Sequence, residues 1–226
     1  MNKQQLFNLF FKEKNYTELK NILNDTQDNT EKYYLARVFL EEKNYNEAAK
    51  LFKSLDLRYE YGRCKLLCGS VEEASQIWKS IEDDTPATLW GKSLLEFINL
   101  YVINIPTFFQ IRAFLEVDLD AVLKAGLITY AENIANGAHL FARNNQESYK
   151  FIGRVFVNNN YHDLAELFLN KAKDICYIDP EVHFMLAKCY LKNNNVKKAK
   201  EALEVSIDKG FGYFPAKRLL NKLNRL

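Results

Sequence analysis

The feature that most restricts the fold of this chain is a short motif that recurs along the sequence. Each copy begins at an Asn or Ser, whose side-chain oxygen can accept hydrogen bonds from the free backbone N–H groups of a new helix. Three copies have a Glu three residues later, which is the spacing of a capping box. A chain that repeats one unit at intervals folds by stacking these units. The five copies are Asn15–Leu19, Asn44–Ala48, Ser70–Ala74, Asn160–Leu164 and Asn195–Ala199.

A second motif lies about seven to nine residues before these caps and reads apolar, small, basic. A small residue between larger apolar ones lets two helices approach closely. Apolar residues at helical spacing follow each cap. Each unit is therefore predicted to be a helix, a short turn and a second helix. The copies are Leu35–Arg37, Tyr61–Arg63, Ile152–Arg154 and Leu186–Lys188, with a fifth, Trp90–Lys92, that no clear cap follows.

Length and composition agree with a helical chain. The 226 residues are 48% hydrophobic, which is enough for a core. With only 8 Gly and 4 Pro, the chain has too few turn residues for an all-β fold. A net charge of +2 is too balanced for a dedicated binder of nucleic acid or acidic membranes. The expected fold is all-α.

The two motifs together resemble the tetratricopeptide repeat (TPR). In that family a large apolar and a small residue stand on the first helix, an aromatic follows one turn later, and an Ala opens the second helix. The step from Ala165 to Ala199 is 34 residues, the family's period, whereas Ala48 to Ala74 is 26, which predicts a shortened first helix. The resemblance covers about residues 1–95 and 146–226 and implies a right-handed superhelical solenoid of antiparallel helix pairs. The matching sets are Leu35, Ala36, Phe39, Ala48 and Phe52; Ile152, Gly153, Phe156, Ala165 and Ala172; and Leu186, Ala187, Tyr190, Ala199 and Leu203.

The middle of the chain, residues 96–145, fits the repeat less well and is predicted to be a degenerate helical segment of one continuous solenoid. Thr85-Pro86 predicts a helix that runs to about Val102. A second helix is expected over Thr107–Val117, and Asp118 is expected to cap a third that Asn136-Gly137 interrupts. Caps at 70 and 160 are about three periods apart, so two degenerate units could fill the gap.

The C-terminal part, residues 146–226, is predicted to end in a capping helix. Asp179-Pro180 has the cap-then-Pro pattern that opens a helix. Gly210–Gly212 is expected to end the last pair, and Pro215–Leu226 then carries Leu219, Leu220 and Leu223 on one stripe. A terminal helix of this kind covers the apolar face of the last repeat.

No residue pattern indicates catalysis or a cofactor. The four cysteines are too sparse for a disulfide scaffold, and the His residues do not have metal-ligand spacing. Asp118-Leu119-Asp120 matches the metal-binding motif of nucleotide-sugar transferases, but those enzymes place it after a strand. We therefore expect no enzyme, no metal and no cofactor. Met1–Tyr16 has no apolar run of signal-peptide length, and Phe97–Leu115 is too polar to span a membrane, so a cytoplasmic protein is expected.

The most informative candidate site is the basic residue that follows each small residue. In the resembled fold the first helices line a concave groove, and these cations would project toward it with aromatic residues one turn earlier. Such a surface suits an acidic or carboxylate-terminated peptide. The alternative is a solvated helix face. The proposed binding residues are Arg37, Arg63, Lys92, Arg154 and Lys188 with Tyr33, Tyr59 and Phe184.

The function predicted from the sequence is a non-catalytic scaffold that binds a protein or peptide. The alternative is an accessory or regulatory subunit of a bacterial enzyme, such as a glycosyltransferase system. No nucleic acid or membrane partner is expected, and the oligomeric state stays open. The apolar stretch Ile103–Phe114 is either core or an exposed patch for a partner or a second copy.

Overall fold

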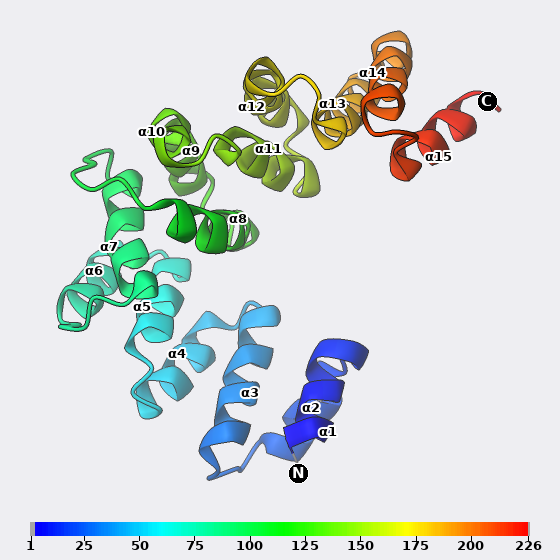
Figure 1. Cartoon of the computed structure of the whole chain (residues 1–226). Helices are drawn as coiled ribbons and strands as arrows, with labels where there is room; N and C mark the ends of the chain where they lie inside the picture. The colour runs from blue at the N-terminus through cyan, green and yellow to red at the C-terminus, as the bar shows by residue number, and fades with distance from the viewer. Residues whose placement is uncertain (1–2, 226) are drawn as a thin grey trace. The chain divides into compact units, whose positions relative to one another are not determined.

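The computed structural model describes residues 3–225, which form fifteen α-helices, one π-helical turn and no strand. The helices divide into two compact units, Met1–Glu96 and Phe97–Leu226. Figure 1 shows the helices following one another in chain order within each unit. The all-α architecture of stacked helix pairs is thus confirmed. The three-part division of the solenoid stays a prediction.

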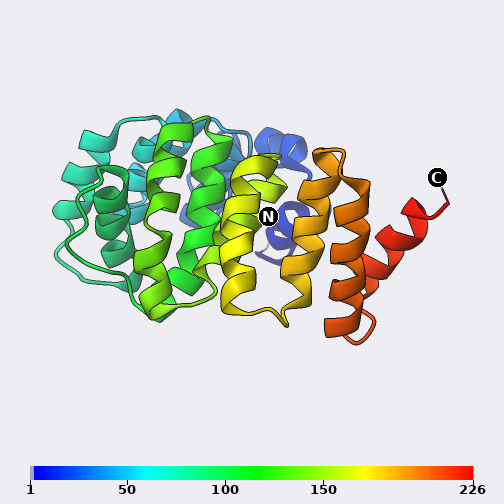
Figure 2. The same ribbon diagram turned by 90° about the horizontal axis from the view of Figure 1, so that it is seen from above.

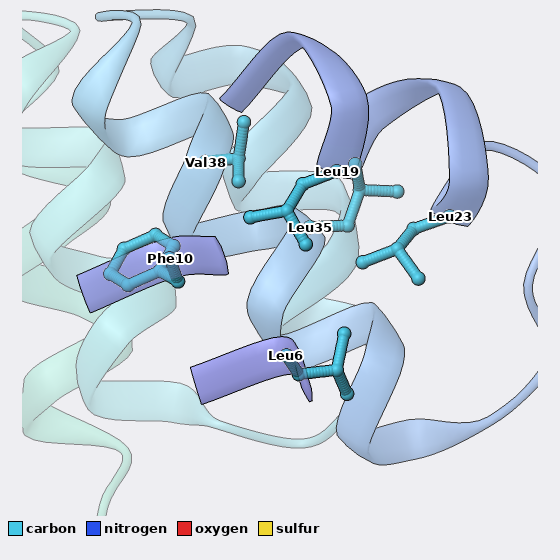
Figure 3. Close-up of a cluster of buried hydrophobic side chains, with 6 residues drawn as sticks. All are labelled: Leu6, Phe10, Leu19, Leu23, Leu35 and Val38. Atoms are coloured by element: carbon cyan, nitrogen blue, oxygen red, sulfur yellow. The ribbon is translucent and has the colours of Figure 1, made fainter. Parts of the chain in front are cut away.

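The first unit is built of consecutive helices that contact mainly their neighbours in sequence. Its first core gathers six buried side chains from the N-terminal helices and α3, drawn in Figure 3: Leu6, Phe10, Leu19, Leu23, Leu35 and Val38. The helices are α1 (Lys3–Phe7), the π-helical turn η1 (Asn8–Glu13), α2 (Tyr16–Leu23), α3 (Asn29–Glu41), α4 (Tyr45–Ser54), α5 (Arg58–Leu67), α6 (Val71–Lys79) and α7 (Pro86–Ile98).

The second unit has the same plan. Figure 2 shows its later helices standing side by side, yellow through orange, with the red terminal helix beside the last pair. The helices are α8 (Phe108–Lys124), α9 (Ile128–Asn136), α10 (Ala138–Asn144), α11 (Ser148–Asn158), α12 (His162–Ile175), α13 (Pro180–Lys192), α14 (Val196–Lys209) and α15 (Phe214–Leu223).

The turns within the helix pairs share one backbone geometry. At Lys43 the chain adopts a left-handed conformation, with φ of 61°, and the next N–H, that of Asn44, donates to the carbonyl of Phe39 at 2.8 Å. This is the bond that closes a helix in a Schellman motif. The same left-handed residue and backward bond recur where α5, α8, α11 and α13 end, with Gly69, Gly126, Asn160 and Asn194 in the left-handed position.

This geometry corrects the register of the fourth motif copy. Asn160 takes the left-handed position, and the cap residue of α12 is Tyr161. Counted from the caps, the fourth residue of each second helix is then Ala48, Ala74, Ala131, Ala165 or Ala199, and every one is fully buried. The list includes Ala131 of α9, so α8 and α9 form a helix pair with the spacing of the others.

Small residues lie where helices touch, as the sequence predicted. Trp78 of α6 is fully buried between Gly62 of α5 and Gly91 of α7. A Cβ on Gly62 would lie 2.5 Å from Nε1 of Trp78, and a Cβ on Gly91 would lie 2.8 Å from its Cδ2. The indole N–H donates to the Tyr59 carbonyl at 3.0 Å, so the ring is fixed in this slot.

The predicted helix bounds in the middle of the chain are partly wrong. The helix that starts at Pro86 ends at Ile98 rather than near Val102. Asp118 caps nothing: it is buried inside α8, which continues to Lys124. The reason is one unbroken apolar stripe after the Thr107 capping box, since Ile111, Leu115, Leu119 and Val122 recur at helical spacing. The predicted break at Asn136-Gly137 is confirmed, because α9 ends and α10 begins there.

The C-terminal helix α15 covers the last pair, as expected. Ala216 is fully buried in a cluster with Ala187, Ala199 and Leu203, and half-buried leucines of α15 pack around them. Asp179 caps α13 by accepting from the N–H of Glu181, and Pro180 follows it. Of the predicted capping segment, Leu226 lies outside the described residues.

Candidate ligand-binding site

The predicted binding residues lie on the first helices of the pairs and on α7, and all five cations are partly buried. Arg37, Arg63 and Lys92 belong to the first unit, on α3, α5 and α7, with Tyr33 and Tyr59 one turn before the first two. Arg154, Lys188 and Phe184 belong to the second unit, on α11 and α13. The predicted set is therefore two groups of side chains, one in each unit.

The first group is largely engaged by the protein itself. The Arg37 guanidinium donates to the Tyr33 hydroxyl at 3.2 Å and lies 5.5 Å from the centre of the Phe10 ring. Lys92 pairs with Asp84 at 3.1 Å. Tyr59 stacks on Trp78 with ring centres 5.8 Å apart. Such contacts leave these groups less available to a ligand.

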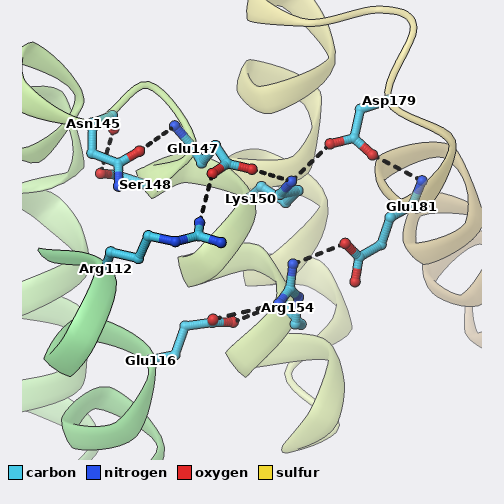
Figure 4. A network of polar contacts seen from close by, with 9 residues as sticks. All are labelled: Arg112, Glu116, Asn145, Glu147, Ser148, Lys150, Arg154, Asp179 and Glu181. Carbon is cyan, nitrogen blue, oxygen red and sulfur yellow. Dashed lines mark hydrogen bonds and ion pairs between the residues drawn. The ribbon is translucent and has the colours of Figure 1, made fainter. Parts of the chain in front are cut away.

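In the second unit Arg154 is held by two carboxylates. Its guanidinium nitrogens lie 3.3 Å from Glu116 of α8 and 2.9 Å from Glu181 of α13. Figure 4 shows Arg154 between these two acids. The partial burial of Glu116 raises the pKa of its carboxyl group in spite of the guanidinium beside it. Arg154 therefore joins α8, α11 and α13 rather than presenting a free charge.

Lys150, one turn before Arg154, takes part in the same network. It pairs with Glu147 and, at 2.9 Å, with Asp179, and Glu147 also accepts from Arg112 at 2.9 Å (Figure 4). Burial would lower the pKa of Lys150, but hydrogen bonds from its ammonium to the two carboxylates outweigh burial and raise it. The lysine is therefore firmly charged and internally neutralised.

One acid of this network, Glu116, comes from a change of residue type in α8. Eight residues before the Leu127 cap, where other pairs have Ala or Gly, α8 has Leu119, followed by Asp120 in place of a cation. Glu116 takes the place that Tyr33, Tyr59 and Phe184 hold in their helices. At these two positions α8 therefore carries acids in place of an aromatic and a basic residue. Glu116 binds Arg154 of the next pair, whereas Asp120 pairs with Lys124 of its own helix and accepts from the Asn159 side chain.

The basic side chains at the C-terminal end of the second unit behave differently. A pocket of about 1400 Å³ opens between the ends of α11 and α12, the exposed side of α13, and α15. Among the described residues, no acidic side chain lines it, and none of its six basic side chains forms an ion pair: Lys188, Lys192, Lys217, Arg218, Lys222 and Arg225.

Apolar side chains also line this pocket. Phe184 lies against Tyr213, with ring centres 5.8 Å apart, and Val157, Leu191 and Leu219 continue the surface. Phe214 stands 72% exposed at the start of α15. Unpaired cations around apolar side chains form a surface for an anionic ligand with a hydrophobic part.

His162, the first residue of α12, also lines this pocket. Both of its ring nitrogens are covered from solvent, and neither has a hydrogen-bond partner in the protein. Burial, and then the charges of Lys192 and Lys188, lower the pKa of the imidazole. A buried polar atom without a partner costs roughly 1–3 kcal/mol, so this side chain is poorly satisfied without a ligand.

Two residues of this pocket, Phe184 and Lys188, are among the binding residues predicted from the sequence, and the others are not. The distribution of charge along the sequence indicates a basic site at this end of the chain. Residues 182–226 hold ten lysines and arginines and three acidic residues, whereas the chain as a whole is nearly neutral. The four basic residues of the terminal segment, Lys217, Arg218, Lys222 and Arg225, lie on the helix that the sequence predicted only as a cap of the last repeat. His162 gave no sequence signal, because its burial depends on how α12 meets α13.

The remaining candidates for chemistry lie apart from this pocket. Cys64 and Cys189 are buried thiols whose desolvation raises their pKa to about 12, and Cys68 and Cys176 are exposed. In the described part of the chain, no group of three or more His, Cys, Asp or Glu side chains could hold a metal ion. No helix among residues 3–225 is long and apolar enough to cross a membrane.

The stretch Ile103–Phe114 is neither wholly core nor wholly surface. Ile111 is fully buried, whereas Ile103 and Phe109 are 66% and 79% exposed. The reason is its local structure: Ile103 lies in an irregular segment before α8, and only one face of α8 points inward.

Stacked helix pairs of this kind form extended surfaces that repeat proteins use for binding. Residues 181–209, in the last helix pair, match the model of the tetratricopeptide repeat. The last pair is therefore similar to that family, as its motifs indicated.

Comparison with curated proteins gave no match. Among solved structures, the chain is similar to the crystal structure of YrrB, described as a TPR protein with an unusual peptide-binding site. The likeness covers 90% of this chain and 96% of that one, at 12% sequence identity and a TM-score of 0.40. At that level it assigns no role to any residue here.

Proposed function

We propose that this protein binds an acidic segment of a partner protein in the pocket between α13 and α15, and we call this site the basic pocket. The observation that carries the proposal is the contrast between paired and unpaired cations. Arg154 and Lys150 are neutralised inside the protein, whereas the six basic side chains of the basic pocket have no carboxylate partner.

The unpaired charges favour a ligand with several carboxylates. Six cations around one pocket repel one another, and an anionic ligand relieves this repulsion while it gains charge-assisted hydrogen bonds. Arg218 and Arg225 can each bind a carboxylate through two parallel N–H groups. Lys188, one turn after Phe184 on α13, is the cation of the predicted set that has the proposed role here.

The size and apolar side chains of the basic pocket favour a polypeptide over a small molecule. Pockets for small ligands measure roughly 300–1,000 Å³, and this one measures about 1400 Å³. Phe184, Leu191 and Leu219 form an apolar surface against which one or two large apolar side chains of the ligand can pack. The preferred ligand therefore carries acidic residues beside a Leu or Phe anchor.

The test is the binding of three fluorescein-labelled 14-residue peptides of one design, with Leu at every fourth position and otherwise Glu, Gln or Lys. Fluorescence anisotropy at about 0.1 M salt should show the Glu peptide binding at least about tenfold more tightly than the Gln peptide, or about 1.4 kcal/mol. Binding should weaken at about 0.5 M salt because screening shortens the reach of the charges.

Matched variants locate the site. Lys188→Glu should weaken binding of the Glu peptide at least about tenfold, since it places a like charge in the pocket. Lys197→Glu makes the same change at an exposed position of α14 outside the pocket and should leave binding nearly unchanged. Arg154→Glu is unsuitable because it breaks an internal network. Equal binding of the Glu and Gln peptides, or equal effects of both lysine variants, would contradict the proposal.

A further inference from the structure

We propose that His162 is a ligand-binding residue of the basic pocket and that it takes up a proton when an acidic segment enters. The inference rests on the proposed function and adds a specific contact and a pH dependence to it. Binding of an acidic ligand is then tighter at pH 6 than at pH 8.

The first support is the state of His162 in the unliganded protein. Its side chain lines the pocket, yet both ring nitrogens are covered and without partners. The residue as a whole is partly exposed, so a rotation of the side chain brings a nitrogen to the pocket. A carboxylate there supplies the acceptor that the protein does not, and an imidazolium donates to it more strongly than a neutral ring does.

The second support is the set of charges around the ring. Lys188 and Lys192 of α13 face it, and α15 adds Lys217, Arg218, Lys222 and Arg225 to the same pocket. Asp163 of its own helix is the acidic group that acts on it, and the residues of α11 in the pocket are uncharged. An entering carboxylate places a negative charge beside the ring and opposes the field of these cations.

The direction of the pH effect follows from these charges. In the free protein burial and the two lysines hold the pKa of His162 below its ordinary value, so the ring is neutral at pH 7. A bound carboxylate raises that pKa, and protons are taken up on binding between the two values. The affinity therefore rises as the pH falls through this window, and it is constant above it.

The experiment is isothermal titration calorimetry of the Glu peptide at pH 6, 7 and 8. At pH 6 and 7 it is repeated in two buffers of different ionisation enthalpy, which gives the number of protons taken up. Glu side chains have a pKa of about 4.3 and stay ionised over this range. We expect net uptake at pH 6 to 7 and affinity at least about threefold higher at pH 6 than at pH 8. Proton NMR of the imidazole should show a higher titration midpoint for His162 in the complex.

Two variants give the controls. His162→Gln keeps a polar side chain that does not titrate, and it should bind the peptide with no proton uptake and no pH dependence. His139→Gln removes an exposed histidine that does not line the pocket, and it should behave as the parent. Melting curves of both variants check the fold, and the NMR titration of the parent decides the matter if His162→Gln is unstable.

The outcomes separate this inference from the proposed function. Absence of peptide binding at every pH overturns both. Binding without proton uptake, or with an unchanged His162 midpoint, overturns the role of His162 and leaves the acidic ligand standing. Uptake that persists in a folded His162→Gln variant assigns the proton to another group and overturns the inference as well.

Discussion

Single glycines and alanines decide how closely the helices of this protein approach. Gly153 of α11 has no space for a side chain, because a Cβ there would lie 2.7 Å from the Leu169 side chain of α12. In an exposed helix, changing Gly to Ala would raise stability by about 1 kcal/mol. At this position the helix contact opposes that gain.

A double-mutant cycle tests the contact. Gly153→Ala should lower the free energy of unfolding by about 1–3 kcal/mol, because the added methyl forces α11 and α12 apart. Leu169→Ala alone should cost about 2–5 kcal/mol through the cavity it leaves. The double variant should cost less than the sum, since each change makes space for the other. Urea unfolding measures all three, and strict additivity would contradict the contact.

Helix α15 has two roles in this protein. Its Leu219, Leu220 and Leu223 cover the last pair, while its basic residues line the basic pocket. One face of the helix therefore stabilises the fold, and the opposite face is available to the ligand.

Deletion of residues 213–226 tests whether α15 covers the last helix pair. Three half-buried leucines at roughly 1 kcal/mol each predict a loss on the order of 3 kcal/mol and a tendency to self-associate through the uncovered face. Light scattering and thermal melting measure both effects. As a control, the double variant Lys217→Ala with Lys222→Ala should keep the melting temperature of the parent, but it should bind the Glu peptide more weakly. A monomeric truncation that melts like the parent would show that α15 does not cap the last pair.

Most of the helices and turns were predicted from the sequence. The caps, the small residues and the Asp179-Pro180 start of α13 are local signals, and they placed the pairs. The errors arose where tertiary packing decides. Asp118 has the residue type of a cap, but the apolar stripe on both sides of it makes α8 one helix. Asn160 also has the type of a cap, but it takes the left-handed position that precedes the cap.

The whole molecule consists of helices whose contacts are mainly with neighbours in the chain. Stability in such a fold is approximately a sum over units and the contacts between adjacent units. Both tryptophans, Trp78 and Trp90, are buried in the first unit, so their fluorescence reports on that unit alone.

Unfolding of the residue 213–226 deletion variant should therefore depend on the probe. The transition followed by far-ultraviolet circular dichroism should broaden or shift to lower urea, because α13 and α14 lose their cover. The free energy of unfolding obtained from the tryptophan transition should change by no more than about 0.3–0.5 kcal/mol, the usual limit for independent sites. Equal shifts in both probes would show that the chain unfolds as one cooperative body.

The candidate site was less predictable than the fold. The row of cations was visible in the sequence, but which of them are neutralised depends on Glu116 and Glu181, which lie on other helices than Arg154. Residue type alone does not distinguish an internally paired Arg154 from an unpaired Lys188. The pocket residues of α15 were recognised only as covering the core, because a sequence does not show which face of a short helix meets a neighbouring cavity.

The internal pairing of the α8 acids also has a consequence for the direction in which a bound segment runs. Glu116 pairs with Arg154 and Asp120 pairs with Lys124, so the charges near α8 are neutralised, whereas the cations of the basic pocket beside α15 are unpaired. A segment with all its negative charge at one end gains most when that end points toward α15. The same sequence read backwards places its charge away from the unpaired cations and gains less. This part of the protein therefore has an electrostatic polarity that can distinguish a peptide from its reversed copy of equal composition and charge.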